Sequence, residues 1–170
     1  MLDRVTQPEI KKVDKIEFQE PVVKELSNGI KVLGFNMGSQ NVVQIELNFF
    51  SGTKAVENSI IASYTSKMLG EASQNFATGE ILDKIDYYGA FLETSTEKDL
   101  TQVSLFALEK QLKNVLPILS EAVLYPKFPG DLLSMHLKNG KHKFNIQNEK
   151  VGFRCRTLFN EELFKNHAYG

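Results

Sequence analysis

Three histidines, His136, His142 and His167, are the first candidates for metal binding or acid–base chemistry in this sequence. Two histidines hold one metal ion from a helix when they stand four residues apart, because they then share a face. His136 and His142 are six residues apart, which corresponds to about 600° of helical turn. They project from different faces, so we expect solvated or capping histidines rather than metal ligands.

The other groups with chemical potential lack the neighbours that would activate them. Ser63 and Ser66 have no His or Asp close by in sequence, so they are expected to be polar helix-face residues rather than nucleophiles. Glu161 and Glu162 are adjacent, and adjacent residues on a helix do not face each other. The single cysteine, Cys155, has no evident cationic neighbour and is predicted to be a buried small hydrophobe. No glycine-rich phosphate loop follows a predicted strand.

Composition describes an ordinary globular chain. Of 170 residues, 42% are hydrophobic and 24% charged, and the formal net charge is -1. Disorder is therefore excluded as the main state, and the charge balance argues against binding nucleic acid through a basic surface. No apolar run approaches the roughly 20 residues that span a bilayer, which indicates a soluble chain. One cysteine cannot form an intramolecular disulfide, and no compartment follows from the sequence; cytoplasm and bacterial periplasm both remain open.

The first half of the chain predicts strands around two helices. Residues 1–21 form an extended lead-in, and a β-hairpin turns at Asn28-Gly29 between runs at 22–26 and 30–35. Apolar and polar residues alternate over 42–50, as in a half-buried strand. Helical spacing follows over 56–71. Thr78 is expected to cap a second helix that ends at Gly89 and buries Ile81, Leu82, Ile85 and Tyr88.

Two further strands and three helical stretches complete the pattern. Runs at 91–96 and 100–108 read as strands, and a helix over 112–123 either begins near Asn114 or kinks at Pro117. From Asp131 onward the chain is compatible with helix, with bends expected at Gly140 and Gly152 and with one face that continues through Cys155, Leu158, Phe159 and Leu163. The order predicts an α+β domain whose antiparallel-rich sheet is covered by helices.

Seven short pieces, taken together, resemble the amino-terminal domain of the insulinase or pitrilysin peptidase superfamily, which includes mitochondrial processing peptidase and the core proteins of the bc1 complex. The resemblance runs from about Val22 to Gly170 and implies a LuxS/processing-peptidase-like metalloenzyme fold, here an inactive peptidase-like domain at 22–170 that stops before the family's last strands. The pieces are Leu26-Ser27-Asn28-Gly29-Ile30-Lys31-Val32, Ser51-Gly52-Thr53, Met68-Leu69, Asp86-Tyr87-Tyr88-Gly89-Ala90, Asp99-Leu100-Thr101, Tyr125-Pro126-Lys127-Phe128 and His167-Ala168-Tyr169-Gly170.

That family's chemistry depends on the motif H-x-x-E-H on one helix and a glutamate from a later helix. Aligned on Met68-Leu69, Ser63 stands for the first histidine, Ser66 for the general base and Lys67 for the second histidine. The third ligand falls at Lys143, or at Phe144 if one residue is gapped. Ile60 replaces a family glycine and suggests tighter packing there. A hydrated ammonium repels Zn²⁺, so the resemblance implies no metal and no cofactor.

The resemblance therefore implies a non-catalytic domain. It would support an active insulinase-type peptidase, as a separate subunit or as the silent half of a longer chain, and help to enclose unfolded peptide. Two alternatives stay open: an active zinc peptidase with unorthodox ligands, and a purely structural interaction subunit.

In active relatives, peptide adds as a strand beside the segment matching 91–96, which puts Leu92, Glu93, Thr94 and Ser95 at the candidate peptide site. The alternative is an edge strand that only completes the sheet. Glu93 stands where relatives commonly have Asn. Because relatives continue with strands that complete the sheet, we also expect an uncovered edge capable of pairing between copies.

Overall fold

The computed structural model describes residues 7, 12 and 15–170. The chain divides into two compact units, Met1–Gln40 and Asn41–Gly170, which are treated separately below. Much of the lead-in predicted for residues 1–21 lies outside the described residues, and residues 15–21 contain no helix or strand.

The first unit contains the predicted β-hairpin. Strands β1 (Val22–Glu25) and β2 (Lys31–Gly34) pair antiparallel, with Val22 opposite Gly34 and Glu25 opposite Lys31. The turn is closed by the amide of Leu26, which donates to the carbonyl of Ile30 at 2.9 Å. Gly29 has φ +82°, a conformation that L side chains rarely adopt, which explains the Asn-Gly signal.

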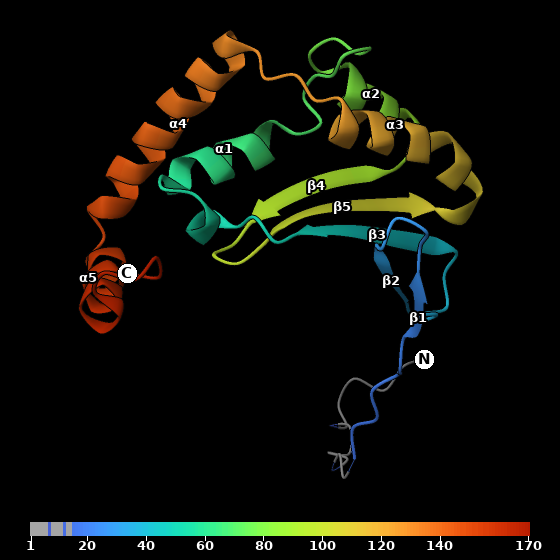
Figure 1. Cartoon of the computed structure of the whole chain (residues 1–170), viewed down its shortest axis with the longest axis horizontal. Coiled ribbons are helices and arrows are strands. Elements are labelled where there is room, and N and C mark those ends of the chain that lie inside the picture. The colour runs from blue at the N-terminus through green and yellow to red at the C-terminus, as the bar shows by residue number, and fades with distance from the viewer. Residues whose placement is uncertain (1–6, 8–11, 13–14) are drawn as a thin grey trace. The chain divides into compact units, whose positions relative to one another are not determined.

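The second unit is built on a three-stranded antiparallel sheet (Figure 1). Its strands are β3 (Val42–Phe49), β4 (Phe91–Thr96) and β5 (Thr101–Leu108), in the order β3-β5-β4. Ile45 and Leu92 both lie opposite Leu105, so the apolar side chains of all three strands share one face. The alternation that predicted β3 and the β-forming residue types that predicted β4 and β5 are both confirmed.

Five helices accompany this sheet in the described residues: α1 (Ser59–Met68), α2 (Glu80–Tyr87), α3 (Leu112–Leu124), α4 (Gly130–Asn148) and α5 (Val151–Phe164). Figure 1 shows α2 and α3 together over one face of the sheet, with α1 farther along it near the β4–β5 turn. The α+β class is therefore as predicted. None of the described helices has both the length and the apolar character needed to cross a membrane.

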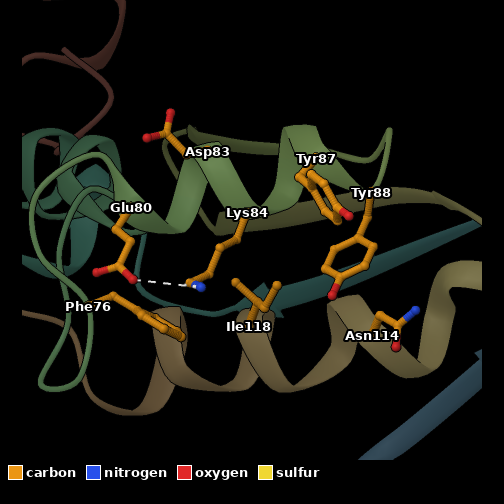
Figure 2. Close-up of a pocket in the computed structure, with 8 residues that line it drawn as sticks. All are labelled: Phe76, Glu80, Asp83, Lys84, Tyr87, Tyr88, Asn114 and Ile118. Carbon is orange, nitrogen blue, oxygen red and sulfur yellow. Dashed lines mark ion pairs between the residues drawn. The ribbon is translucent and has the colours of Figure 1, made fainter.

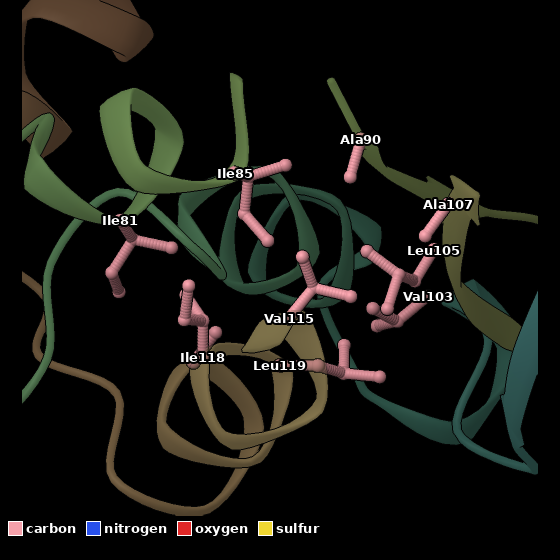
Figure 3. Packing of buried hydrophobic residues seen from close by; sticks show 10 residues of the cluster. Ile81, Ile85, Ala90, Val103, Leu105, Ala107, Val115, Ile118 and Leu119 are labelled. Atoms are coloured by element: carbon pink, nitrogen blue, oxygen red, sulfur yellow. The ribbon is translucent and has the colours of Figure 1, made fainter. Parts of the chain in front are cut away.

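The hydrophobic core lies between the sheet and the α2–α3 pair (Figure 3). Its centre is formed by side chains that are fully buried or nearly so. They are Ile81 and Ile85 from α2, Ala90, then Val103, Leu105 and Ala107 from β5, and Val115, Ile118, Leu119 and Ala122 from α3. Each buried aliphatic side chain of this kind contributes about 1.5–3 kcal/mol relative to exposure, so this cluster dominates the stability of the unit.

Several local predictions about the helices are wrong. The N-cap of α2 is Gly79, with φ +83°, and not Thr78, and Leu82 is exposed although it was placed in the buried stripe. Helix α3 begins at Leu112, before Asn114, and contains Pro117. The chain leaves the helix at Glu149–Lys150, between α4 and α5. Gly140 and Gly152, where bends were expected, lie within α4 and α5.

Two predictions of burial also fail. Cys155 is exposed, as are Leu158, Phe159 and Leu163 on the same helix, because no described element packs over that face of α5. Ile60 is half exposed and does not tighten the packing around α1; the buried residues of that helix are Ala62, Ser66 and Met68. The helical period of the apolar residues identified one face of α5, but it does not show whether another element packs on that face.

Gly52 fixes the connection between β3 and α1. The amides of Thr53 and Lys54 donate to the carbonyls of Glu97 and Lys98 at 2.9 and 3.0 Å, which joins this connection to the β4–β5 turn. A Cβ on Gly52 would stand 2.5 Å from the amide nitrogen of Leu100 and 2.6 Å from the carbonyl carbon of Asp99. Two of the family-like pieces, 51–53 and 99–101, thus meet in space.

We predict that Gly52→Ala lowers the free energy of unfolding by about 2 kcal/mol or more, because the backbone of residues 98–100 leaves the methyl group no room. Gly152→Ala is the matched control: nothing lies within 4 Å of its Cβ, and alanine favours helix. Urea unfolding of the two variants measures the difference. Equal stability of both variants would contradict the close approach at Gly52.

Candidate functional site

Helix α1 carries Ser63, Ser66 and Lys67, the three residues that the sequence resemblance aligns with the zinc motif. The Ser63 hydroxyl donates to the carbonyl of Ser59 at 3.0 Å, one turn earlier on the same helix. Ser66 is buried, whereas Lys67 is exposed and its ammonium lies 5.8 Å from the centre of the Tyr64 ring. The helix thus presents hydroxyls and one cation at these positions.

The long helix α4 contacts α1 at Tyr64. The Tyr64 hydroxyl donates to the backbone carbonyl of His136 at 3.3 Å. It rests on Gly140, where a Cβ would overlap the hydroxyl oxygen. Lys143 and Phe144, the two candidates for the third-ligand position, lie farther along α4 and are exposed. Gly140 therefore allows close packing between the two helices.

His136 and Glu71 form a second link between α4 and the end of α1. The Nε2 atom of His136 lies 2.7 Å from Oε1 of Glu71, and His136 is buried, which corrects the prediction of a solvated or capping histidine. His142 and His167 are exposed, as predicted. Oε2 of Glu71 is buried without a hydrogen-bond partner among the described residues. This pair was missed because its members are 65 residues apart and belong to no spacing motif.

The donor set around α1 does not suit zinc. Zinc sites use thiolate, imidazole and carboxylate groups, usually three or four of them converging. In the described portion of the chain, no three His, Cys, Asp or Glu residues gather closely enough to hold a metal ion. Hydroxyls that bond to their own helix and an ammonium group are not substitutes, because the first are weak donors and the second is repelled.

Strand β4 is an edge strand of the three-stranded sheet, and α1 lies against it. The amide of Glu97 donates to the carbonyl of Leu100 at 2.9 Å, which makes this the first hydrogen-bonded pair of the hairpin. Because such pairs alternate in antiparallel strands, the backbone groups of Glu93 and Ser95 are directed to β5. Those of Leu92 and Thr94 are directed to the open edge. Of the four candidate peptide residues, only Leu92 and Thr94 therefore have backbone groups that an added strand could bind.

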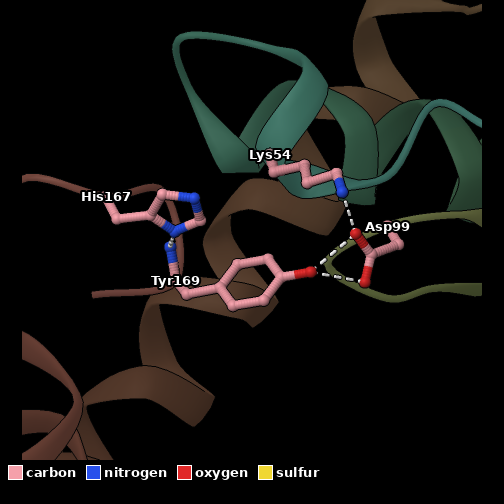
Figure 4. A network of polar contacts seen from close by, with 4 residues as sticks. All are labelled: Lys54, Asp99, His167 and Tyr169. Atoms are coloured by element: carbon pink, nitrogen blue, oxygen red, sulfur yellow. Dashed lines mark hydrogen bonds and ion pairs between the residues drawn. The ribbon is translucent and has the colours of Figure 1, made fainter. Parts of the chain in front are cut away.

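The closing residues of the chain bind back onto the β4–β5 turn (Figure 4). The Tyr169 hydroxyl lies 2.6 Å from both carboxylate oxygens of Asp99, and the Lys54 ammonium pairs with the same carboxylate. The amide of Tyr169 also donates to Nδ1 of His167 at 3.2 Å. The family-like piece 167–170 thus joins the two pieces that meet at Gly52.

Charge coupling in this network is visible in the pKa values. The hydrogen bond from Lys54, and then that from Tyr169, lowers the pKa of Asp99, and Asp99 in turn raises the pKa of both Lys54 and Tyr169. The contribution of Asp99 to stability is therefore lost as the pH falls through its lowered value, whereas those of Lys54 and Tyr169 are lost as the pH rises through their raised values. Lys54 and Asp99 are exposed and Tyr169 is half-buried, so solvent screens the network and its contribution to stability is small.

An open groove lies between α2 and α3 (Figure 2). It encloses about 590 Å³ and is lined by Phe76, Glu80, Asp83, Lys84, Tyr87, Tyr88, Asn114 and Ile118. Its one ion pair joins Lys84 to Glu80 at 3.7 Å, and the Lys84 ammonium lies 5.3 Å from the centre of the Phe76 ring. Its titratable groups are dispersed and do not converge on one point, so no catalytic chemistry is assigned to it.

No family model matches the chain. It is 29% identical over 136 residues to subunit alpha of mitochondrial-processing peptidase from Bos taurus, and equally to the Homo sapiens protein. That match covers 79% of this chain and 26% of each relative. Among solved structures, the fold matches a peptidase M16 inactive domain from Pseudomonas fluorescens with a TM-score of 0.83, at 23% identity, over 89% of this chain and 37% of that one. It also matches the periplasmic protease PqqL from Escherichia coli with a TM-score of 0.72, at 14% identity, over 91% of this chain and 18% of that protease.

The fold, with its sheet edge beside α1, is therefore that of an M16 peptidase domain. In sequence the chain is similar to mitochondrial-processing peptidase subunit alpha, and in fold it resembles peptidase domains of the insulinase, or M16, superfamily. It spans about a quarter of the length of those curated relatives.

We predict that Gly140→Ala is less favourable, by about 1 kcal/mol, than the helix propensity of alanine alone would give, because the new methyl group would displace the Tyr64 hydroxyl from α4. The same substitution in a Tyr64→Phe background should cost less, since the atom in conflict is then absent. Thermal or urea unfolding of the four proteins in this double-mutant cycle gives the coupling energy, expected to be about 1 kcal/mol. Strict additivity would show that the two residues do not meet.

Proposed function

We propose that this chain is a non-catalytic peptidase domain, the silent subunit or half of an insulinase-type assembly that helps to enclose peptide substrate. One observation carries the proposal: in an M16 fold, α1 has Ser63, Ser66 and Lys67 at the positions of the metal-binding motif. Hydrolysis by this family's mechanism needs a metal-bound water, and the helix provides neither imidazole to hold the metal nor carboxylate to accept the proton.

The surroundings of α1 support the proposal. His136, which could in principle donate an imidazole, is engaged by Glu71 at 2.7 Å and supports the contact between α4 and the end of α1. Tyr64 occupies the space over Gly140. A metal would have to displace these contacts and approach the ammonium of Lys67.

The relatives' names agree with a supporting role. One solved neighbour is called an inactive domain, and the curated relatives are named as one subunit of a processing peptidase. The fold also matches the ferredoxin protease FusC, with a TM-score of 0.66 at 16% identity. That structure contains FusC in complex with Arabidopsis ferredoxin. A silent half of a clam-shell assembly would contribute enclosing surface and an open strand edge instead of a metal.

We predict that the purified protein, incubated with Zn²⁺ and desalted, retains well below one zinc per chain and does not cleave unstructured peptides. Elemental analysis by plasma mass spectrometry and a fluorogenic peptide assay measure the two quantities. The positive control is Ser63→His with Lys67→His, which restores an i, i+4 histidine pair and should retain more zinc than the parent. Stoichiometric zinc in the parent, with chelator-sensitive cleavage, would contradict the proposal and favour an active peptidase with unorthodox ligands.

The edge of β4 is the part of the domain that would touch peptide. Leu92 and Thr94 offer outward backbone groups there, and main-chain bonds of this kind give affinity with little dependence on peptide sequence. Leu92 is fixed against Gly70, where a Cβ would stand 2.9 Å from its Cδ2. Glu93 and Ser95 would influence binding only through their side chains.

We predict that Thr94→Pro weakens the binding of a short fluorescent unstructured peptide by about fivefold to tenfold, because it removes an outward N–H while β4 keeps its bonds to β5. Glu93→Ala is the matched control and should leave affinity nearly unchanged. Fluorescence anisotropy measures both, and circular dichroism checks that the variants fold. If Glu93→Ala weakens binding as much as Thr94→Pro, the peptide does not add as a strand at this edge.

A further inference from the structure

The two faces of the three-stranded sheet differ in cover and in charge. One face packs against α1, α2 and α3 and carries apolar side chains such as Leu92 and Leu105 (Figure 1). Alternate residues of each strand point to the opposite face. On that face, strands β3, β4 and β5 place two exposed carboxylates, Glu46 and Glu93, and no Lys, Arg or His side chain. The sheet itself therefore offers these carboxylates no cation.

Glu93 is the carboxylate that stands at the open edge. It lies opposite Ser104 of β5, which in turn lies opposite Glu46 of β3. Two strand spacings, about 10 Å, separate β3 from β4. Glu46 accepts a hydrogen bond from Nε2 of Gln44 at 2.5 Å, whereas Glu93 has no ion-pair partner among the residues that the structure describes. Glu93 is therefore an uncompensated negative charge on the edge strand.

A peptide strand added to this edge would place one side chain directly opposite Glu93. The backbone groups of Leu92 and Thr94 point outward, so they form the hydrogen-bonded pairs with an antiparallel peptide. Glu93 then faces the peptide in a non-hydrogen-bonded pair, in which the Cα atoms are about 4.5 Å apart and the side chains are closest. The facing side chain points to the same open face as Glu93.

The same peptide side chain can also reach Phe91. This residue precedes Glu93 by two positions on the same face of β4, and it is 65% exposed. It is the diagonal neighbour of the facing peptide residue, within reach of a long side chain. Its ring offers apolar surface to a methylene stem and a π face to a cation, while Glu93 offers a carboxylate. Lys and Arg carry both a stem and a cationic head.

We propose that Glu93 is a specificity-determining residue that selects peptides with a Lys or Arg side chain facing it. The inference rests on the peptide edge proposed above and adds the class of peptide that this edge prefers. An acidic side chain in the same register would meet Glu93 at short range and is disfavoured. Selection acts on every second peptide residue, since only these residues point to the open face.

The test measures fluorescence anisotropy of the whole chain with three labelled peptides of Ala, Ser and Thr that carry Lys, Glu or Ala at the centre. The parent protein should bind the Lys peptide about twofold to fivefold more tightly than the Ala peptide, and the Glu peptide most weakly. This preference should fall as salt rises. Glu93→Gln should abolish the preference, and Glu93→Lys should invert it. Glu109→Lys makes the same charge change at an exposed site outside the sheet and should keep the parent's order.

Thr94→Pro separates this inference from the proposed peptide site. If Thr94→Pro weakens binding of all three peptides but Glu93→Lys leaves their order unchanged, the peptide lies at the edge and the role of Glu93 is wrong. If Thr94→Pro leaves all three affinities unchanged, the peptide does not lie at this edge and both proposals fail. Equal inversion by Glu109→Lys and Glu93→Lys would mean that net charge alone sets the order, which also overturns the inference. Circular dichroism checks that each variant folds.

Discussion

Close packing around α1 is the constraint on which the candidate site depends. The helix lies between β4 and α4, and glycine allows the contact on each side: Leu92 of β4 fits against Gly70, and Tyr64 of α1 fits against Gly140 of α4. A Cβ at either glycine would meet a neighbouring side chain at less than van der Waals distance. The edge strand β4, helix α1 and helix α4 are therefore joined by close packing.

Protein contacts, and not a shared metal ion, link α1 to α4 in this structure. In a metal site, side chains on two helices are joined by their shared ion, and the helices are stabilised by that bond. Here the hydroxyl of Tyr64 and the Glu71–His136 pair make the connection between α1 and α4. The Ser63 hydroxyl bonds to its own helix, and Lys67 is a solvated cation beside the ring of Tyr64.

The sequence predicted the elements with local signals and missed contacts between distant residues. The Asn28-Gly29 turn, the alternation in β3 and the end of α2 at Gly89 follow from φ preferences and side-chain period, and the structure confirms them. Cys155 was wrongly predicted to be buried because period gives the face of a helix, not whether that face is covered. The Glu71–His136 pair and the Tyr64–Gly140 contact join residues that no spacing rule relates. The order of the motifs predicted the peptidase-like fold, and the Lys54–Asp99–Tyr169 network joins three of those motifs in space.

The most direct test of the central claim is diffraction from crystals of the protein soaked in Zn²⁺, with data collected on both sides of the zinc absorption edge. If the claim is right, the anomalous difference map has no peak within coordination distance of Ser63, Ser66 or Lys67, and Tyr64 stays seated on Gly140. A strong peak beside α1, coordinated by protein side chains, would contradict it.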